Sequence, residues 1–545
     1  MRRLEVDGLP AVLAPVSGPT HAGLVFRVGT ADEPLARRGI TRLVERLVTN
    51  GRGGLVGPEH TYFHVQGSAA AITEYLAGVC EALRDPPTQR LAAARERAGR
   101  AERDPLPMWR HGARGFGAAS YPEWALPGLT EDDLREWITR YFTRENAALW
   151  VAGDEVPEGL ALDLPSGERR PAPAAATTLP VTPAFFPGET PGVVAWDTVV
   201  RRGPHAAVFA NVLERRMLDE LGGTGRARTE YVIRCDGTAR IAAVAEVPPD
   251  QQEAALGGLV DVLAAVRAGR IDPDEVAAVV KLTCTGLRES ESRGARLPGQ
   301  AFSLLAGREV QSLEEALAEV RAVTVADVAV VASEAYDSGL LMTPPGGTAG
   351  WAGYAAAPAM SETVLAGRTH RGRGNRTIRL ISGDEGVSVT GPDVVASVGW
   401  ESCVAMLAWP DGARHLIGED AVVARIEPSL FRGADRVVRE ADARVPQRLR
   451  IEMPPRDRDR IPRPEPAPRT GAGRLYATLT VSGLFVLFFV AGAVWALIRL
   501  LTGLGDTRED ALALAGSLAF GAFCARYCWI AARDLGSLRK GPHHG

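Results

Sequence analysis

The longest apolar stretch of the chain lies near its C-terminus. Leu475 to Ile498 contains 24 residues without a charged side chain, which is long enough to cross the hydrocarbon core of a bilayer as an α-helix. Ala511 to Ala532 is also apolar except for Arg526. We therefore expect two transmembrane helices, 475–498 and 511–532, that form a C-terminal helical hairpin. A charge at mid-bilayer is costly, so Arg526 is expected to face the other helix or an interface.

The charges that flank these segments predict an orientation. The connecting loop TGLGDTRED is acidic, whereas basic residues precede the first segment and follow the second: Arg456, Arg458, Arg460, Arg463, Arg469 and Arg474, then Arg533, Arg539 and Lys540. Because basic flanks favour the cytoplasmic side, we expect a multi-pass protein of the cell membrane with the N-terminal domains and the C-terminus in the cytoplasm. The N-terminus, MRRLEVDGLPAV, lacks the apolar core of a signal peptide.

Breaks rich in proline divide the remainder of the chain into three blocks. We expect linkers at 164–191 and 343–359 and an Arg/Pro linker at 454–474, which leaves the blocks 1–163, 192–342 and 360–453. The first two blocks contain both strand and helix patterns, so the expected fold class is α+β. The third block contains short strands about the turns 383–386, 410–412 and 418–420, followed by one amphipathic helix, FRGADRVVREADARVP.

The segment Gly39 to Gly51, GITRLVERLVTNG, is an amphipathic helix with an unusual polar face. In an ordinary surface helix Leu43, Val44 and Leu47 pack against a core. The polar residues Arg42, Glu45 and Arg46 then form solvated pairs one turn apart. Thr41 is placed to cap the start of this helix. The elements around the segment favour a more specific interpretation.

The surrounding elements resemble the pitrilysin/insulinase (inverzincin) family of zinc peptidases. The strand and loop AGLVFRVGTADEPLARRG precede the helix, and FGAASYPEWALPGLTEDDLREWITRYFTRENAALWVAGD follows the order of the family's later helix and strand. Pro87 to Glu102 approximates an intervening motif of that family. The second block is similar to the related second half of these peptidases, and EVRAVTVADVAVVASEAY resembles its end. The family resemblance implies that these two blocks are two α/β sandwich halves. The third block has a weaker resemblance to a bacterial pleckstrin-homology-like (PH-like) domain.

The resemblance implies a degenerate metal site. Family members carry H-x-x-E-H, in which two histidines bind zinc and the glutamate activates water; here Arg42 and Arg46 occupy the histidine positions and Glu45 remains. A guanidinium has no acceptor lone pair and cannot be a ligand. The third ligand position falls near Arg97, with Glu96 one residue away, so no metal, cofactor or catalytic residue is predicted.

The second half carries one remnant of the family's substrate site. The resemblance places Asp219 where active members have an arginine, whereas Tyr231 is retained at the position of their tyrosine. An ordinary strand or core residue is the simpler interpretation of Tyr231.

The composition excludes some kinds of partner and site but does not indicate a mechanism. The net charge is −4, so no nucleic-acid partner is expected. Lysine occurs only at positions 281 and 540, and the excess of Arg, Ala and Gly indicates a bacterial gene of high GC content. Six cysteines lack C-x-x-C spacing. His60 and His64 form an H-x-x-x-H pair, but their neighbours predict a strand, which disfavours a replacement metal site. The arginines of RTHRGRGNRTIR are suited to anionic lipid headgroups or to a solvated loop.

Together these features predict a membrane-anchored, catalytically inactive insulinase-like protein. It is expected to bind peptide, or to act as a scaffold or partner subunit of an active homologue, at the cytoplasmic face. The alternative is a zinc-dependent metalloendopeptidase with a rebuilt metal site, or the non-catalytic subunit of an active heteromer that uses Tyr231. A third possibility is a membrane structural module in which the last two domains act.

Overall fold

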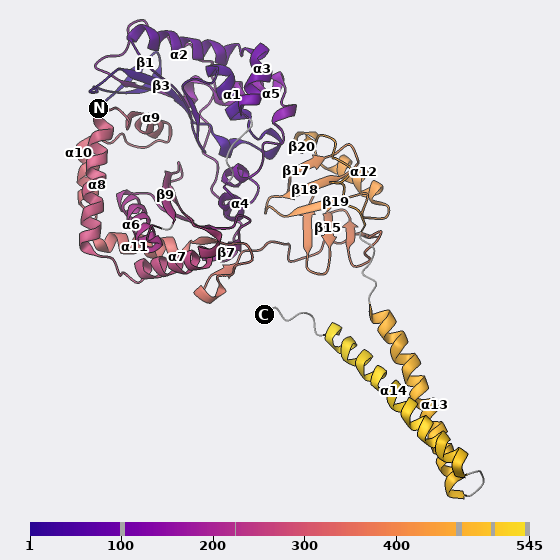
Figure 1. Ribbon diagram of the computed structural model, residues 1–545. Coiled ribbons are helices and arrows are strands. Elements are labelled where there is room, and N and C mark those ends of the chain that lie inside the picture. Colours follow the sequence, from indigo (N-terminus) through magenta and orange to yellow (C-terminus); the bar gives the residue numbers. More distant parts are fainter. Residues whose placement is uncertain (99–103, 224, 465–470, 503–506, 540–545) are drawn as a thin grey trace. The chain divides into compact units, whose positions relative to one another are not determined.

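The computed structural model describes residues 1–98, 104–223, 225–464, 471–502 and 507–539 (Figure 1). By its internal contacts the chain divides into two compact units. One comprises Met1–His370, Arg379–Pro428 and Gly433–Arg460, and the other comprises Arg371–Ile378, Ser429–Arg432 and Ile461–Gly545.

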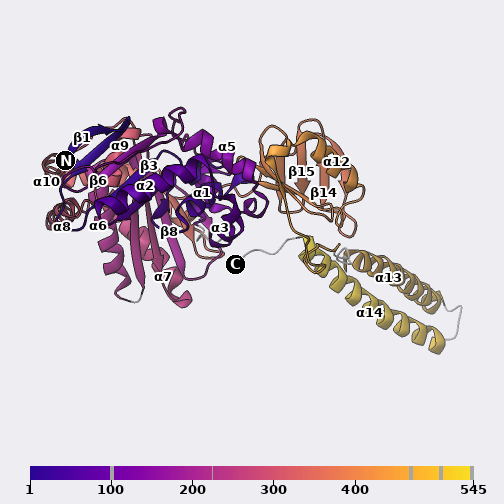
Figure 2. The ribbon, with the colours of Figure 1, turned by 90° about the horizontal axis from the view of Figure 1, so that it is seen from above.

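The first block is built on a six-stranded sheet with the order β1-β2-β6-β3-β5-β4. The strands are β1 (Arg2–Val6), β2 (Leu9–Ala14), β3 (His21–Phe26), β4 (Gly54–Val56), β5 (Thr61–Gln66) and β6 (Ala147–Ala152). The helices are α1 (Ile40–Thr49), α2 (Ala69–Arg84), α3 (Leu91–Ala98), α4 (Leu106–His111) and α5 (Glu131–Tyr141). Figure 2, seen from above, shows α1 and α2 over this sheet.

Both faces of the first sheet are covered, and the residues of β6 alternate between them. Ala147 and Leu149 belong to the core shared with α1, α2 and α5. Ala148 and Trp150 point to the other face, which packs against α9 (Leu297–Leu305) of the second block. This alternation is the two-residue period of a strand, and it makes β6 buried along its whole length.

The second block repeats this architecture with the strand order β12-β7-β11-β8-β10-β9. The strands are β7 (Ala184–Pro187), β8 (Val193–Arg201), β9 (Arg226–Ile233), β10 (Thr238–Glu246), β11 (Leu340–Thr343) and β12 (Ala355–Ala356). Besides α9, the helices are α6 (Pro204–Leu221), α7 (Gln252–Arg267), α8 (Pro273–Ser292), α10 (Leu313–Arg321) and α11 (Val325–Asp337). The α+β class with two α/β halves therefore agrees with the structure.

Two of these strands fall inside segments expected to be linkers. β7 lies within 164–191 and pairs in parallel with β11, and β12 lies within 343–359 and pairs with β7. Each of the two segments thus contributes one short strand to the second sheet. Both strands are short, with β12 at the edge of the sheet and β7 next to it. The prolines and glycines around them therefore dominate the sequence pattern.

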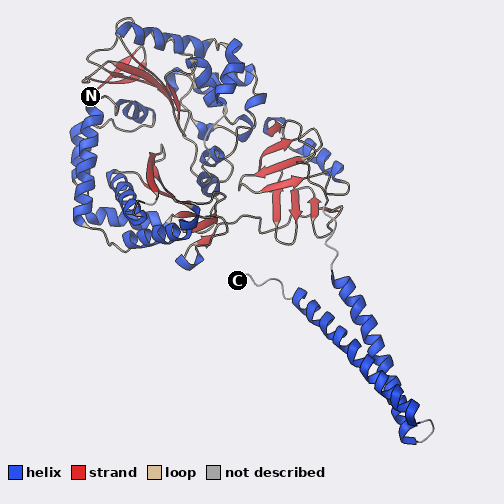
Figure 3. Cartoon of the chain, in the orientation of Figure 1, coloured by secondary structure: helices blue, strands red, loops and turns tan. Residues whose placement is uncertain are grey.

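The third block contains two four-stranded sheets and one helix, shown in Figure 3 with the strands in red. One sheet is β13 (Arg368–Arg371), β14 (Arg379–Ser382), β15 (Gly386–Thr390) and β16 (Val395–Gly399). The other, in spatial order, is β19 (Val423–Ile426), β18 (Arg414–Gly418), β17 (Cys403–Ala408) and β20 (Arg450–Glu452). The helix is α12 (Ala434–Arg444). The turns expected at 383–386, 410–412 and 418–420 all lie between strands, and the expected helix is present.

The expected Arg/Pro linker 454–474 begins as an ordered part of the third block. Arg456 donates to both carboxylate oxygens of Glu427 at 2.9 Å, and its Nε donates to Asp411 at 2.8 Å. His415 Nε2 lies 2.7 Å from the same Glu427. These contacts hold the pKa of the buried Glu427 below its usual value, because the two partners outweigh the effect of burial.

Two long helices close the chain, α13 (Gly471–Thr502) and α14 (Thr507–Arg539). Phe489 of α13 stacks on Phe520 of α14 with ring centroids 5.6 Å apart. Within the described residues one segment, Thr480–Arg499, is long and apolar enough to cross a membrane. The shorter apolar segment Ala511–Arg526 lies in α14.

Candidate functional site

Helix α1 is fixed by a buried carboxylate at its N-terminus. Glu33, whose side chain is fully buried, accepts hydrogen bonds from the backbone N–H groups of Gly39 and Thr41, both at 2.9 Å. Arg38 Nη1 donates to the same carboxylate at 2.6 Å. The free N–H groups and the positive end of the helix dipole favour an anion there. The sequence placed Thr41 at the cap of this helix, but the N-cap residue is Gly39, with φ 94°.

Arg42 occupies the first histidine position of the family motif, and its guanidinium is held in an ion pair. Its Nη1 lies 2.7 Å from Glu123 Oε1 and 3.4 Å from the carbonyl oxygen of Ala98, which ends α3. The side chain is only one-fifth exposed. A cation is thus located where a zinc ligand is expected, and a neighbouring carboxylate neutralises it.

Glu45 is buried, with 1% of its surface exposed. Its Oε1 accepts from the Thr49 hydroxyl at 3.2 Å, and its Oε2 lies 3.2 Å from Nε of Arg46, at the second histidine position. Burial raises the pKa of Glu45, and Arg46 only partly opposes this. Gly54 of β4 lies so close that a Cβ there would come within 1.9 Å of Glu45 Oε1. Glu45 is therefore enclosed, and the expectation of a solvated pair is wrong for this residue.

Arg97 lies at the other end of α1. Its Nη2 donates to the side-chain oxygen of Asn50, the residue that ends the helix, at 3.2 Å. Both Arg97 and its neighbour Glu96 are exposed. The structure therefore brings three of the sequence-predicted positions, Arg42, Arg46 and Arg97, onto or beside one helix.

The residues at these positions do not fit a zinc ion. Zinc sites use imidazole, thiolate or carboxylate ligands, whereas all three positions carry guanidinium groups that stay protonated. Among the described residues, no group of three or more His, Cys, Asp or Glu side chains is arranged to hold a metal. Glu102, which belongs to the approximated motif, lies outside the described residues.

His60 and His64 do not form a substitute pair. His64 is an exposed residue of β5, and His60 precedes that strand and packs against Tyr62 and Phe302. Burial lowers the pKa of His60 to about 4. The strand predicted for this segment is confirmed.

Tyr231 is a half-buried residue of β9 whose hydroxyl is engaged within its own half. It donates to the carbonyl oxygen of Gly203 and accepts from the N–H of the same residue, both at 3.2 Å. Burial raises its pKa. Asp219, at the family's arginine position, is exposed on α6. These contacts match the role of a structural strand residue.

A buried ionic cluster that the sequence did not predict joins the first two blocks. Asp197, completely buried in β8, accepts hydrogen bonds from the Nε atoms of Arg110 in α4 and Arg240 in β10. Arg110 Nη2 also donates to the carbonyl oxygens of Asp197 at 2.7 Å and Ser338 at 2.9 Å. One signal was present in the sequence: an aspartate inside the apolar strand VVAWDTVV requires a partner when buried.

A second buried contact lies beside this cluster. His111 Nε2 is 3.0 Å from Nη2 of Arg234, and its Nδ1 is 2.6 Å from the carbonyl oxygen of Ala176. Because a guanidinium only donates, Nε2 must accept, so the proton of the neutral ring is on Nδ1 and is donated to Ala176. Burial first, and then Arg234, lowers the pKa of His111 to about 4.

Comparisons with known proteins identify the fold class. No family model matches the chain, and no curated protein matches it by sequence. Solved structures do match. A peptidase M16 inactive domain from Pseudomonas fluorescens has a TM-score of 0.51 at 14% identity and covers 67% of this chain and 99% of its own. A protease from Helicobacter pylori has a TM-score of 0.50 at 15% identity, with 63% and 99% covered.

A further similar structure, titled complex III2 from Candida albicans, has a TM-score of 0.52 at 14% identity and covers 63% of this chain and 95% of that one. These structures are M16-peptidase-like or insulinase-like proteins. The chain therefore has an M16-peptidase-like fold. At such low identity the similarity establishes the fold alone, so activity has to be argued from the residues around α1.

Proposed function

We propose that this chain is a catalytically inactive M16-like protein that binds peptide or serves as a partner subunit. One observation carries the proposal: Arg42 and Arg46 replace the two ligand positions on α1, and their guanidiniums pair with Glu123 and Glu45. A zinc ion there would meet two positive charges, and neither guanidinium offers it a lone pair. Glu45 is buried beside Gly54, and its two carboxylate oxygens are engaged by Thr49 and Arg46.

The fold supports a role in binding. Both halves have complete sheets and well-packed cores, although arginines occupy the ligand positions on α1. A complete fold without zinc ligands is suited to binding rather than to catalysis. One similar structure is described as an inactive M16 domain, and another belongs to a multi-subunit complex. By analogy, the partner of this chain is an active peptidase homologue or a peptide.

We also propose that α13 and α14 form a transmembrane hairpin with both ends in the cytoplasm. Thr480–Arg499 is long enough to span a membrane. Small residues and aromatic rings line the packing of the two helices: Gly492 lies beside Ser517, Gly521 beside Phe489, and Ala496 is fully buried. Small residues of this kind allow close helix packing in membranes. The flanking arginines supply the orientation.

Metal analysis of the purified full chain tests the proposal. The chain is extracted in detergent, exposed to zinc, dialysed and analysed for bound metal and for cleavage of a quenched fluorescent peptide. We expect substoichiometric zinc and no zinc-dependent cleavage. The variant Arg42→Ala/Arg46→Ala, which removes the cations without adding ligands, should behave in the same way. One zinc per chain in the wild type, together with chelator-sensitive cleavage, would show that the chain is an enzyme.

A further inference from the structure

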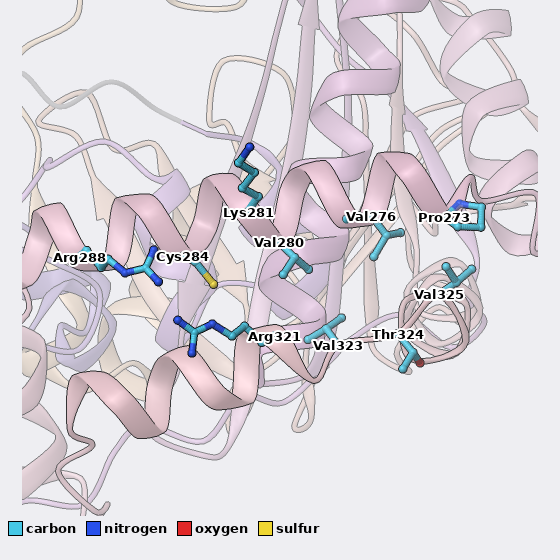
Figure 4. A pocket seen from close by; sticks show the side chains of 11 residues that line it. Pro273, Val276, Val280, Lys281, Cys284, Arg288, Arg321, Val323, Thr324 and Val325 are labelled. Atoms are coloured by element: carbon cyan, nitrogen blue, oxygen red, sulfur yellow. The ribbon is translucent and has the colours of Figure 1, made fainter.

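A groove of about 490 Å³ runs between α8 and the corner where α10 meets α11 (Figure 4). Val276 and Val280 of α8 face Val323 and Val325 across it and form an apolar floor. Toward the other end, Figure 4 shows Arg288 and Arg321 reaching from the two helices on either side of Cys284. Lys281 of α8 also lines the groove, and in Figure 4 its ammonium group points away from α10. The groove thus has an apolar part and a cationic part.

The three cations of the groove lack counter-charges within the described chain. The side chains of Lys281, Arg288 and Arg321 are exposed, and no carboxylate of a described residue forms an ion pair with them. Neighbouring arginines are paired: Arg216 lies 2.7 Å from Glu275, and Arg296 lies 2.6 Å from Glu291. In a chain of net charge −4, three unpaired cations around one groove repel one another and attract an anion.

The geometry points to a helical occupant. We propose that the groove, called here the α8–α10 groove, binds an acidic amphipathic helix of a partner protein. Its lining extends along α8 from Pro273 to Arg288, which corresponds to about 22 Å of helix. An apolar stripe would pack on the valines, and carboxylates would meet the two arginines.

The floor of the groove favours such a partner over other anions. Val280, Val323 and Val325 are half-buried between the helices, so a projecting side chain reaches them more readily than a flat bilayer surface does. The apolar floor also disfavours nucleic acid, because its anionic phosphate backbone binds to rows of cationic side chains on a protein. This inference goes beyond the proposed function, because the groove lies in the second block and involves no residue near α1. Zinc analysis and groove binding can therefore fail separately.

A labelled peptide and a pair of charge variants test the α8–α10 groove. The probe is a synthetic 16-residue helix with leucines every three or four residues and flanking glutamates, and its binding to the detergent-solubilised full chain is followed by fluorescence anisotropy. Control peptides have the same composition scrambled, or lysines in place of the glutamates. The protein variants are Arg288→Glu/Arg321→Glu and the matched pair Arg90→Glu/Arg135→Glu, whose side chains are exposed in the first block.

We expect saturable binding of the acidic helix that weakens at least tenfold in Arg288→Glu/Arg321→Glu and is unchanged in the matched variant. The lysine peptide should prefer the charge-reversed protein. Circular dichroism confirms that the variants are folded. The proposal is overturned by the absence of saturable binding up to about 1 mM peptide, by equal binding of the scrambled peptide, or by equal affinity for the charge-reversed protein. Displacement of the peptide by decanoate or anionic vesicles, without the effect of the arginine variants, would also overturn it.

Discussion

Removing the charge of Asp197 should destabilise the chain severely. The carboxylate lies on β8 with 1% of its side chain exposed, and it balances Arg110 and Arg240. Burial alone raises its pKa, but the two guanidiniums outweigh burial and hold the pKa well below the usual value. In Asp197→Asn the shape is preserved while two buried cations lose their shared anion.

The expected loss of unfolding free energy depends on the hydrogen-bond acceptors that Arg110 and Arg240 keep in Asp197→Asn. Breaking a buried ion pair by removing one partner costs about 3–5 kcal/mol. Arg110 keeps two carbonyl acceptors, and Arg240 keeps Asp104 at 2.7 Å. We therefore expect the lower end of the range, about 3 kcal/mol of unfolding free energy. Because Arg110 lies in the first block and Asp197 in the second, protease sensitivity of 164–191 should rise as well.

Denaturant unfolding of the full chain, followed by tryptophan fluorescence, measures the effect, since Trp196 is buried next to Asp197. Asp219→Asn, an identical substitution at an exposed site on α6, is the matched control and should stay within about 0.5 kcal/mol of the wild type. The low pKa places the loss of this contribution at acidic pH only, below the unfolded value of about 3.9. A variant as stable as the control at pH 7 would refute the reasoning.

Two further predictions concern buried titratable groups. The pKa of His111, about 4 in the folded chain and about 6.5 when unfolded, means that the unfolded chain binds more protons between these values. Stability should therefore fall as pH drops from 6.5 to 4, by on the order of 3 kcal/mol. A pH series of unfolding curves should show a shallower slope for His111→Gln, and an unchanged slope contradicts the assignment. Gly54→Ala should lower the melting temperature because its methyl group collides with Glu45. Glu45→Ala in the same chain should recover most of the loss, and simple additivity of the two effects would contradict this coupling.

Local patterns predicted much of the fold. The helix that carries Arg42, Glu45 and Arg46, the strand of His64 and the turns of the third block follow from periodicity and from glycine-rich turns. The burial of Glu45 could not be predicted from these local patterns, because it depends on how closely β4 approaches α1. The capping of α1 was also missed, since Glu33 reaches the helix through a loop rather than from the position next to it.

The ionic cluster illustrates a different limit of the sequence. The position of Asp197 in an apolar strand indicates a buried charge. Its partners Arg110 and Arg240 are 87 and 43 positions away, and the chain has many other arginines, so the sequence does not identify them. The packing of α4 against the second sheet selects Arg110, and the pairing of β10 with β8 selects Arg240. The PH-like resemblance of the third block, the domain boundaries and the membrane orientation stay predictions.

Helix α9 has a mechanical consequence. Although α9 belongs to the second block in sequence, Leu297, Phe302 and Leu305 pack on Val25 and Trp150 of the first sheet. Detaching this helix would expose several side chains, each costing about 1.5–3 kcal/mol. Any hinge movement between the halves must therefore carry α9 with the first sheet and bend the chain on either side of it. Glycines with left-handed backbone angles stand at both of those places, Gly294 with φ 71° and Gly307 with φ 66°.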